Sequence, residues 1–166
     1  MASVVRSKSA ASAMAAFSRA LRERLGFQLA EASSYATILE RGDDTVPADE
    51  LRQLRSDELE HVALLVAICE SLEIIPIPIE PNADAAPAKT RVERLHALLE
   101  SELADVYGWE ALAVAADAAG LRSAAERLRV VLSAERQHCE RACAWLSEEL
   151  SREAAASERT PPPVPS

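Results

Sequence analysis

The sequence predicts an all-α protein: a four-helix bundle in which a long Pro-rich crossover joins the second helix to the third. Ala, Leu, Glu and Arg are abundant, whereas only 4 of the 166 residues are glycine and 4% are aromatic, which is typical of helical proteins. Leu and Ala recur at helical spacing through four long segments. With 49% hydrophobic residues, the chain has enough apolar surface for one domain with a sizeable core.

Turn residues delimit the first two helices. The first is predicted from about Ser12 to Arg41, because Gly42 and the acidic residues after it favour a turn. The second begins with Pro47 in its first turn, a position that proline tolerates well, and continues to about Glu73. The connection between them is short, so these helices are expected to be antiparallel neighbours.

The other two helices form a second pair. The third is predicted from near Lys89 to just before Gly120, a typical C-terminal glycine. The fourth starts almost at once and extends to about Arg152. The predicted bundle therefore covers residues 12–152. The Pro-rich tail of residues 153–166 is expected to be disordered, with a role in recognition as the alternative.

The link from Ile75 to Ala88 decides the topology. Its fourteen residues include four prolines and, near polyproline geometry, would span about 43 Å. A helix of 27 residues is about 40 Å long. The link is therefore long enough to run the length of the bundle and to start the third helix parallel to the second.

Two Glu-x-x-His motifs carry the strongest functional signal. Glu58 and His61 form one, and Glu135 and His138 form the other. Positions three apart lie on one face of a helix, so both side chains of each motif can reach one metal ion. Two such helices, each aided by a lone carboxylate on another helix, provide the ligands of a dinuclear iron or manganese site in a four-helix bundle. The remaining histidine, His96, is expected to be an exposed bystander.

Each lone carboxylate is expected on the helix that precedes its motif, at the same height of the antiparallel helix pair. Glu102 precedes Glu135 by 33 residues, which places both at mid-height of an antiparallel pair. In the first helix, Gln28 and Glu31 precede Glu58 by 30 and 27 residues and lie on the same face. Charge favours Glu31, because two divalent cations need about four carboxylates to approach neutrality.

Composition excludes several classes of function. The net charge of −9 makes nucleic acid and anionic membranes poor partners, and no apolar run approaches the length of a membrane span. The three cysteines contain no Cys-x-x-Cys pair, which argues for a reducing compartment and against a rubredoxin-type iron centre. A cytoplasmic location is expected, although the basic, acid-free first 22 residues faintly resemble a transit peptide.

The four-helix pattern of Glu, Glu-x-x-His, Glu, Glu-x-x-His resembles the ferritin-like superfamily, including bacterioferritins and rubrerythrins, over about residues 15–150. The string Leu25-Gly26-Phe27-Gln28-Leu29 looks like the bacterioferritin string in which a Glu ligand holds the position of Gln28. The stretch Ser101–Glu110 is similar to uncharacterised bacterial ferritin-like domain proteins. The resemblance therefore implies a ferritin-like bundle, with Gln28 as a departure from its ligand pattern.

This resemblance also implies a role for each residue. Glu58 and Glu135 would bridge two metal ions, iron or manganese, while the other four would bind one ion each. The expected metal ligands are Glu31, Glu58, His61, Glu102, Glu135 and His138. Asp105 corresponds to an additional carboxylate of rubrerythrins. Tyr35 is the candidate catalytic residue, orienting an imidazole or taking part in redox steps, with a plain core role as its alternative.

A dinuclear iron centre of this kind is expected to oxidise Fe(II) with oxygen or to reduce peroxide. Its electron donor would be a separate protein, and assembly as a homodimer or larger homo-oligomer fits the family. Two alternatives stay open. Gln28 favours a metal-free bundle with a structural or binding role. A diiron monooxygenase would require a substrate pocket beside the metals.

Overall fold

The computed structural model describes residues 2–79 and 90–159. Within these ranges the chain forms four α-helices and no strand, which confirms the predicted all-α, four-helix architecture. The helices are α1 (Ala2–Arg41), α2 (Ala48–Ser71), α3 (Arg91–Ala118) and α4 (Arg122–Arg159). The most extensive packing pairs α1 with α2 and α3 with α4, and α1 also packs against α3.

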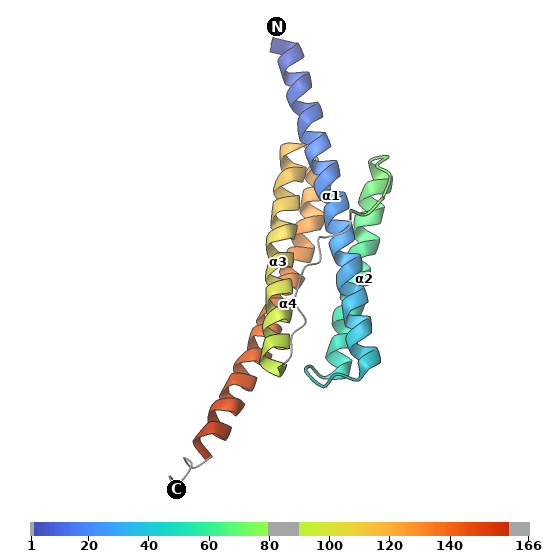
Figure 1. Cartoon of the computed structure of the whole chain (residues 1–166). Helices are drawn as coiled ribbons and strands as arrows, with labels where there is room; N and C mark the ends of the chain where they lie inside the picture. The colour runs from blue at the N-terminus through green and yellow to red at the C-terminus, as the bar shows by residue number, and fades with distance from the viewer. Residues whose placement is uncertain (1, 80–89, 160–166) are drawn as a thin grey trace.

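Figure 1 shows the direction of each helix. The chain runs down the bundle in α1 and up in α2, and it then runs up again in α3 and down in α4. Helices α2 and α3 are therefore parallel, as the length of the link predicts. Pro76 and Pro78 lie in the described part of this link, whereas Pro81 and Pro87 of the predicted crossover lie outside the described residues.

Two helices extend further than predicted. Helix α1 begins at Ala2 rather than Ser12, and α4 ends at Arg159 rather than Arg152. Both ends project beyond the bundle in Figure 1. Residues 153–159 are thus helical where a disordered tail was predicted, because an Ala-rich segment favours continued helix and no breaker precedes the proline run. The rest of the predicted tail lies outside the described residues.

Residues at the helix ends explain the boundaries. Gly42 and Gly120, which follow α1 and α3, have φ angles of 64° and 78°, a region that glycine adopts without strain. Thr90 and Glu93 form a capping box at the start of α3: Thr90 Oγ1 accepts from the Glu93 amide at 3.1 Å, and the Thr90 amide donates to Glu93 Oε2 at 2.9 Å.

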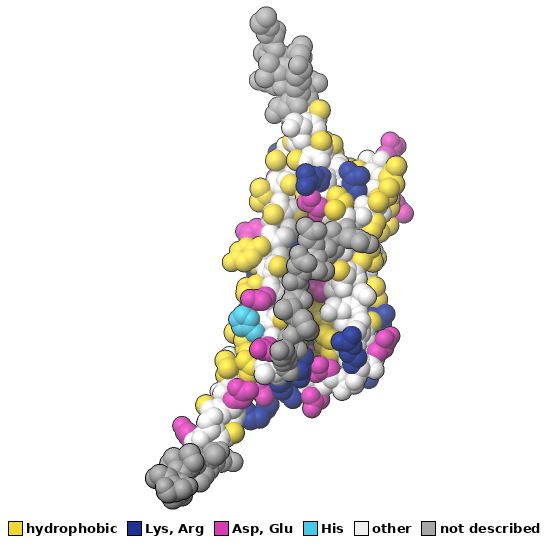
Figure 2. Space-filling view, viewed as in Figure 1, with side chains coloured by type: hydrophobic (Ala, Val, Ile, Leu, Met, Phe, Trp, Pro, Cys, Tyr) yellow, Lys and Arg dark blue, Asp and Glu magenta, His cyan; other side chains and the backbone are white. Residues whose placement is uncertain are grey.

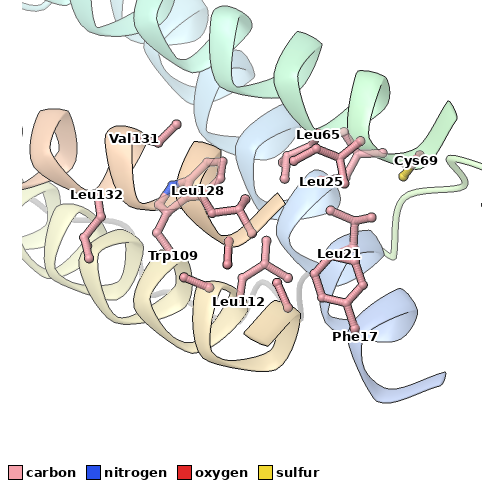
Figure 3. Packing of buried hydrophobic residues seen from close by; sticks show 14 residues of the cluster. Phe17, Leu21, Leu25, Leu65, Cys69, Trp109, Leu112, Leu128, Val131 and Leu132 are labelled. Atoms are coloured by element: carbon pink, nitrogen blue, oxygen red, sulfur yellow. The ribbon is translucent and has the colours of Figure 1, made fainter. Parts of the chain in front are cut away.

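Two apolar clusters form the core. The larger one includes Trp109 of α3 and side chains from all four helices, some of which are labelled in Figure 3. The smaller one includes Tyr35, Val46, Leu51, Leu54 and Leu95. Along α1, α2 and α3, a short buried polar segment lies between the residues of the two clusters. Figure 2 shows Lys and Arg interspersed with Asp and Glu on the outer face.

Gly26 allows the link to approach α1. The Ile79 amide donates to the Arg22 carbonyl at 3.0 Å, and a Cβ atom at Gly26 would overlap the carbonyl oxygen of Ile79. Gly26→Ala is expected to lower the free energy of unfolding by about 1–3 kcal/mol, because backbone must shift to accommodate the methyl group. Urea denaturation measures this, with Ser33→Ala on the exposed face as a control. Equal loss in both variants would contradict the close approach.

Candidate metal centre

Nine polar side chains from the four helices form one buried layer between the two apolar clusters. They are Arg24, Gln28 and Glu31 on α1, Glu58 and His61 on α2, Glu102 and Asp105 on α3, and Glu135 and His138 on α4. On each helix they are spaced by three or four residues, so they share its inward face. Burying this many charges is costly unless other groups compensate them.

The two Glu-x-x-His motifs face each other across the bundle. Glu58 has Oε2 at 3.4 Å from His61 Nδ1 and Oε1 at 3.7 Å from His138 Nδ1. Glu135 has Oε1 at 3.0 Å from His61 Nδ1 and Oε2 at 3.3 Å from His138 Nδ1. The imidazole centroids are 6.3 Å apart. Each carboxylate therefore directs one oxygen toward each histidine, which is the arrangement that bridging two ions requires.

The side of the cluster around His138 has four ligand groups. One donor atom each from Glu58, Glu102, Glu135 and His138 lie within 4.8 Å of one another. His138 Nε2 lies 3.1 Å from Asp57 Oδ2, and this contact leaves Nδ1 directed at the carboxylates. A carboxylate on the outer nitrogen orients an imidazole for metal binding.

Helix α1 contributes both Gln28 and Glu31 to the buried layer, and their contacts differ. Gln28 Nε2 donates to Asp105 Oδ1 at 2.7 Å, so the amide faces a carboxylate of α3. Glu31 Oε1 accepts from Ser101 Oγ at 2.6 Å. Oxygens of Glu31, Glu58 and Asp105 lie within 4.8 Å of one another and form a second donor group. The structure thus brings Glu31 to the cluster together with Asp105, and Glu58 belongs to both groups.

Tyr35 contacts one of the clustered carboxylates directly. Its hydroxyl donates to Glu102 Oε1 at 2.5 Å, and the side chain is 1% exposed. Burial and the negative charges of Glu31 and Glu102 raise its pKa well above the usual value, so the hydroxyl keeps its proton. His96 is exposed and lies 3.5 Å from Glu100, away from the cluster.

Arg24 is a buried cation beside the cluster. Its Nη2 atom lies 2.6 Å from Asp105 Oδ1, and the side chain is 5% exposed. The guanidinium stacks 4.2 Å from the ring centroid of Phe27. A Cβ atom at Gly108 would overlap Nη1, so the glycine makes room for the arginine against the α3 backbone.

Sequence reasoning missed Arg24, Asp57 and Ser101. A signal for Arg24 was present, because Arg24, Gln28, Glu31 and Tyr35 follow heptad-like spacing on the apolar face of α1. Four polar residues in such a row indicate a buried network rather than a solvated face. Asp57 and Ser101 immediately precede Glu58 and Glu102, and nothing in the sequence separates them from ordinary surface residues.

The cluster has polar atoms that are buried and not hydrogen-bonded to any described residue. Glu31, Glu58, Glu102, Asp105 and Glu135 each have at least one such carboxylate oxygen, and His138 Nδ1 is another. Buried polar groups nearly always have a partner, so a concentration of orphans indicates a ligand. Carboxylate oxygens with imidazole nitrogens suit iron or manganese, and the donor set therefore fits such ions.

Protons compensate the charges of the metal-free cluster. Burial lowers the pKa of both histidines, but the Glu135 and Glu58 carboxylates close to the rings outweigh it and raise the values to about 9 for His61 and about 10 for His138. Burial would raise the pKa of Glu135, yet the histidines lower it to about 2. Burial and the charge of Glu31 raise the pKa of Glu102 to about 8. Burial raises the pKa of Asp105 as well.

These shifts predict that the metal-free protein loses stability as pH rises. His61 and His138 hold protons that the unfolded chain releases, so their contribution is complete below about pH 6.5 and is lost as pH passes about 9 to 10. The raised pKa of Glu102 acts in the same direction between about pH 4.5 and 8. Melting curves in EDTA should show Tm falling from pH 5 to 10, with a flatter profile for Glu102→Gln. A Tm that rises would contradict this charge assignment.

Comparison with known proteins gives information on the fold alone. No family model matches the sequence, and no curated protein matches it at a significant level. The structure is similar to the crystal structure of a protein from Xanthomonas campestris pv. campestris str. ATCC 33913, with a TM-score of 0.71. The two chains share a fold. The match covers 89% of this chain and 99% of that one at 14% identity, which carries no information on activity. In the described part of the chain, none of the helices combines the length and the hydropathy of a membrane span.

Proposed function

We propose that the chain is a ferritin-like bundle whose buried layer binds two divalent metal ions, iron or manganese. The observation that carries this proposal is the geometry of Glu58 and Glu135, each of which directs one oxygen toward His61 and the other toward His138. The orphaned donor atoms support it, as do the parallel directions of α2 and α3. A single long crossover is typical of ferritin-like bundles.

The residues of the chain would bind, orient and insulate the ions. Glu58 and Glu135 would bridge them, with Glu102 and His138 completing one position. Glu31 and Asp105, which form a donor group with Glu58, are available to the other, and His61 would provide its imidazole from beside Glu58 and Glu135. The two apolar clusters exclude water on either side, and Tyr35 holds Glu102 while keeping a proton beside it. When bound as Fe(II), a metal pair supplies the two electrons that reduce oxygen or peroxide.

Metal titration tests this proposal and the expected difference in affinity between the two metal positions. We expect one tight equivalent of Fe(II) or Mn(II), at the four-ligand side around His138, and one weaker equivalent. Gln28→Glu should tighten the weaker one, because a carboxylate replaces a neutral amide, and Glu31→Ala should weaken it. Anaerobic titration against a chelating competitor measures both. Two equally tight equivalents in the parent protein, or no effect of Glu31→Ala, would contradict the assignment to α1.

The expected reaction with oxygen or peroxide can be measured on the protein that this titration loads with Fe(II). Protein loaded with Fe(II) is expected to consume oxygen or peroxide at a rate that depends on bound iron. The reaction would need a separate electron donor to turn over repeatedly, because the sequence lacks a Cys-x-x-Cys centre. The free state of all three cysteines agrees with a reducing, cytoplasmic location, and the ferritin-like resemblance favours a homo-oligomer.

A metal-free structural bundle is the second candidate. The buried contacts of Arg24 with Asp105 and of His61 with Glu135 favour it, because they compensate charge without an ion. Elemental analysis of protein expressed in iron- and manganese-supplemented medium separates the two candidates. Stoichiometric metal supports the centre, whereas substoichiometric metal with no uptake on reconstitution supports the structural role.

A further inference from the structure

Arg24 places a positive charge inside the buried layer of carboxylates and imidazoles. Among the lysines and arginines whose side chains the structure describes, it is the only buried one. Its Cζ atom lies 4.2 Å from the ring centroid of Phe27 and 5.9 Å from that of Trp109, and Gly108 leaves space for the guanidinium. Nη1 also donates to the Asp105 carbonyl at 3.4 Å. Groups on both α1 and α3 therefore hold this charge in place.

The carboxylate that pairs with Arg24 also belongs to a group of potential metal donors. Asp105 Oδ1 lies 2.6 Å from Arg24 Nη2 and accepts from Gln28 Nε2 at 2.7 Å. Asp105 Oδ2 accepts no hydrogen bond from any described residue. Oxygens of Asp105, Glu31 and Glu58 lie within 4.8 Å of one another. A divalent ion in this group would share a carboxylate with the guanidinium, and the two positive charges would repel each other.

The charges of the layer show what this repulsion does. Five buried carboxylates, each ionised as metal binding requires, and one guanidinium leave four net negative charges when both imidazoles are neutral. Two divalent ions balance these charges. Without Arg24 the layer would keep one negative charge in excess after both ions had bound, so it would attract the second ion more strongly.

We propose that Arg24 is a permanent cation of the layer that sets the affinity of the second metal position: it compensates Asp105 in the metal-free fold and weakens the binding of an ion beside Glu31 and Asp105. The four-ligand group around His138 does not include Asp105, so its affinity depends less on the guanidinium. This role rests on the proposed function, within which Arg24 controls affinity without being a ligand. The metal-free protein gains stability, and the second ion is held more weakly.

Anaerobic titration of the full chain with Mn(II), against a chelating competitor, tests the effect of this charge. Arg24→Gln and Arg24→Met remove the charge and should tighten the weaker equivalent by at least about tenfold, with a smaller change in the tighter one. Arg24→Lys keeps the charge and should keep the affinity of the parent protein to within about threefold. Arg19→Gln removes an exposed arginine from the same helix and should change neither equivalent.

Melting curves with and without Mn(II) separate this role from that of an ordinary buried ion pair. Arg24→Met should lower the Tm of the metal-free protein. A fixed concentration of Mn(II) should then reduce the difference in Tm between variant and parent, because the variant binds the second ion more tightly. An arginine with a purely structural role would lower Tm equally in both conditions. Arg24→Gln, which keeps a hydrogen-bond donor beside Asp105, gives the same comparison with a smaller loss of stability.

The outcomes distinguish failure of this proposal from failure of the metal centre. A weaker equivalent that is unchanged in folded Arg24→Gln, equal tightening in Arg24→Lys, or a difference in Tm that Mn(II) does not reduce would overturn the role of Arg24 alone. A parent protein that binds no Mn(II) in the layer would contradict the proposed metal centre and this role with it.

Discussion

Replacing Glu135 by alanine is expected to abolish the rise in Tm that Fe(II) or Mn(II) produces in the parent protein. A ligand at one hundred times its Kd stabilises the native state by about 2.7 kcal/mol, which corresponds to roughly 5–10 °C in a domain of this size. Glu135 has one oxygen beside each histidine, so its removal takes a ligand from both positions. The quantity measured is the difference in Tm with and without metal.

Two controls separate this effect from a general change in charge or surface. Glu140→Ala removes an exposed acid from the same helix, and His96→Ala removes the exposed histidine of α3. Both should keep the full metal-dependent rise. A rise of equal size in Glu135→Ala and Glu140→Ala would show that the metal binds outside the cluster.

Arg24→Met is expected to have the largest effect on folding itself, lowering the free energy of unfolding by about 3–5 kcal/mol. The arginine and Asp105 are both buried and 2.6 Å apart, so removing the arginine leaves the buried carboxyl without its cation, and the carboxyl must either stay charged or take up a proton in the folded state. Methionine keeps much of the apolar length of the side chain, so lost packing contributes little. Urea denaturation at neutral pH measures the change.

A double-mutant cycle tests the cause of that loss. Replacing both partners, Arg24→Met with Asp105→Leu, should recover much of the stability, because an apolar pair carries no uncompensated charge. Arg19→Met serves as the surface control, because Arg19 and Glu23 form an exposed pair whose loss should change the free energy of unfolding very little. Additive losses in the double variant would mean that Arg24 and Asp105 stabilise the fold independently.

The fold was predictable because the residue pattern of each helix lies within one segment of the sequence. The distance that the link between α2 and α3 can span also follows from its length. The glycines after α1 and α3 end those helices as expected, and the length of the link from Ile75 to Ala88 predicted that α2 and α3 are parallel. The extent of α4 was less predictable. Its last turns have little to pack against, so intrinsic propensity rather than an apolar stripe sustains them.

The site was predictable in part, through intervals between residues. The 33 residues from Glu102 to Glu135 span an antiparallel pair, and the structure brings these two side chains to one cluster with His138. The side-chain contacts between α1 and α3 were not predictable, because the hydrogen bond of Gln28 with Asp105 depends on how α1 is rotated against α3. Pattern alone assigns a buried face but not the residue that each side chain meets across it.

Anomalous diffraction from crystals of the full chain loaded with Mn(II) or Fe(II) tests the metal centre most directly. We predict a strong peak among Glu58, Glu102, Glu135 and His138, and a weaker second peak on the other side of Glu58, toward Glu31 and Asp105. The absence of any peak in this layer, in a protein with metal bound only at surface carboxylates, would contradict the proposed function.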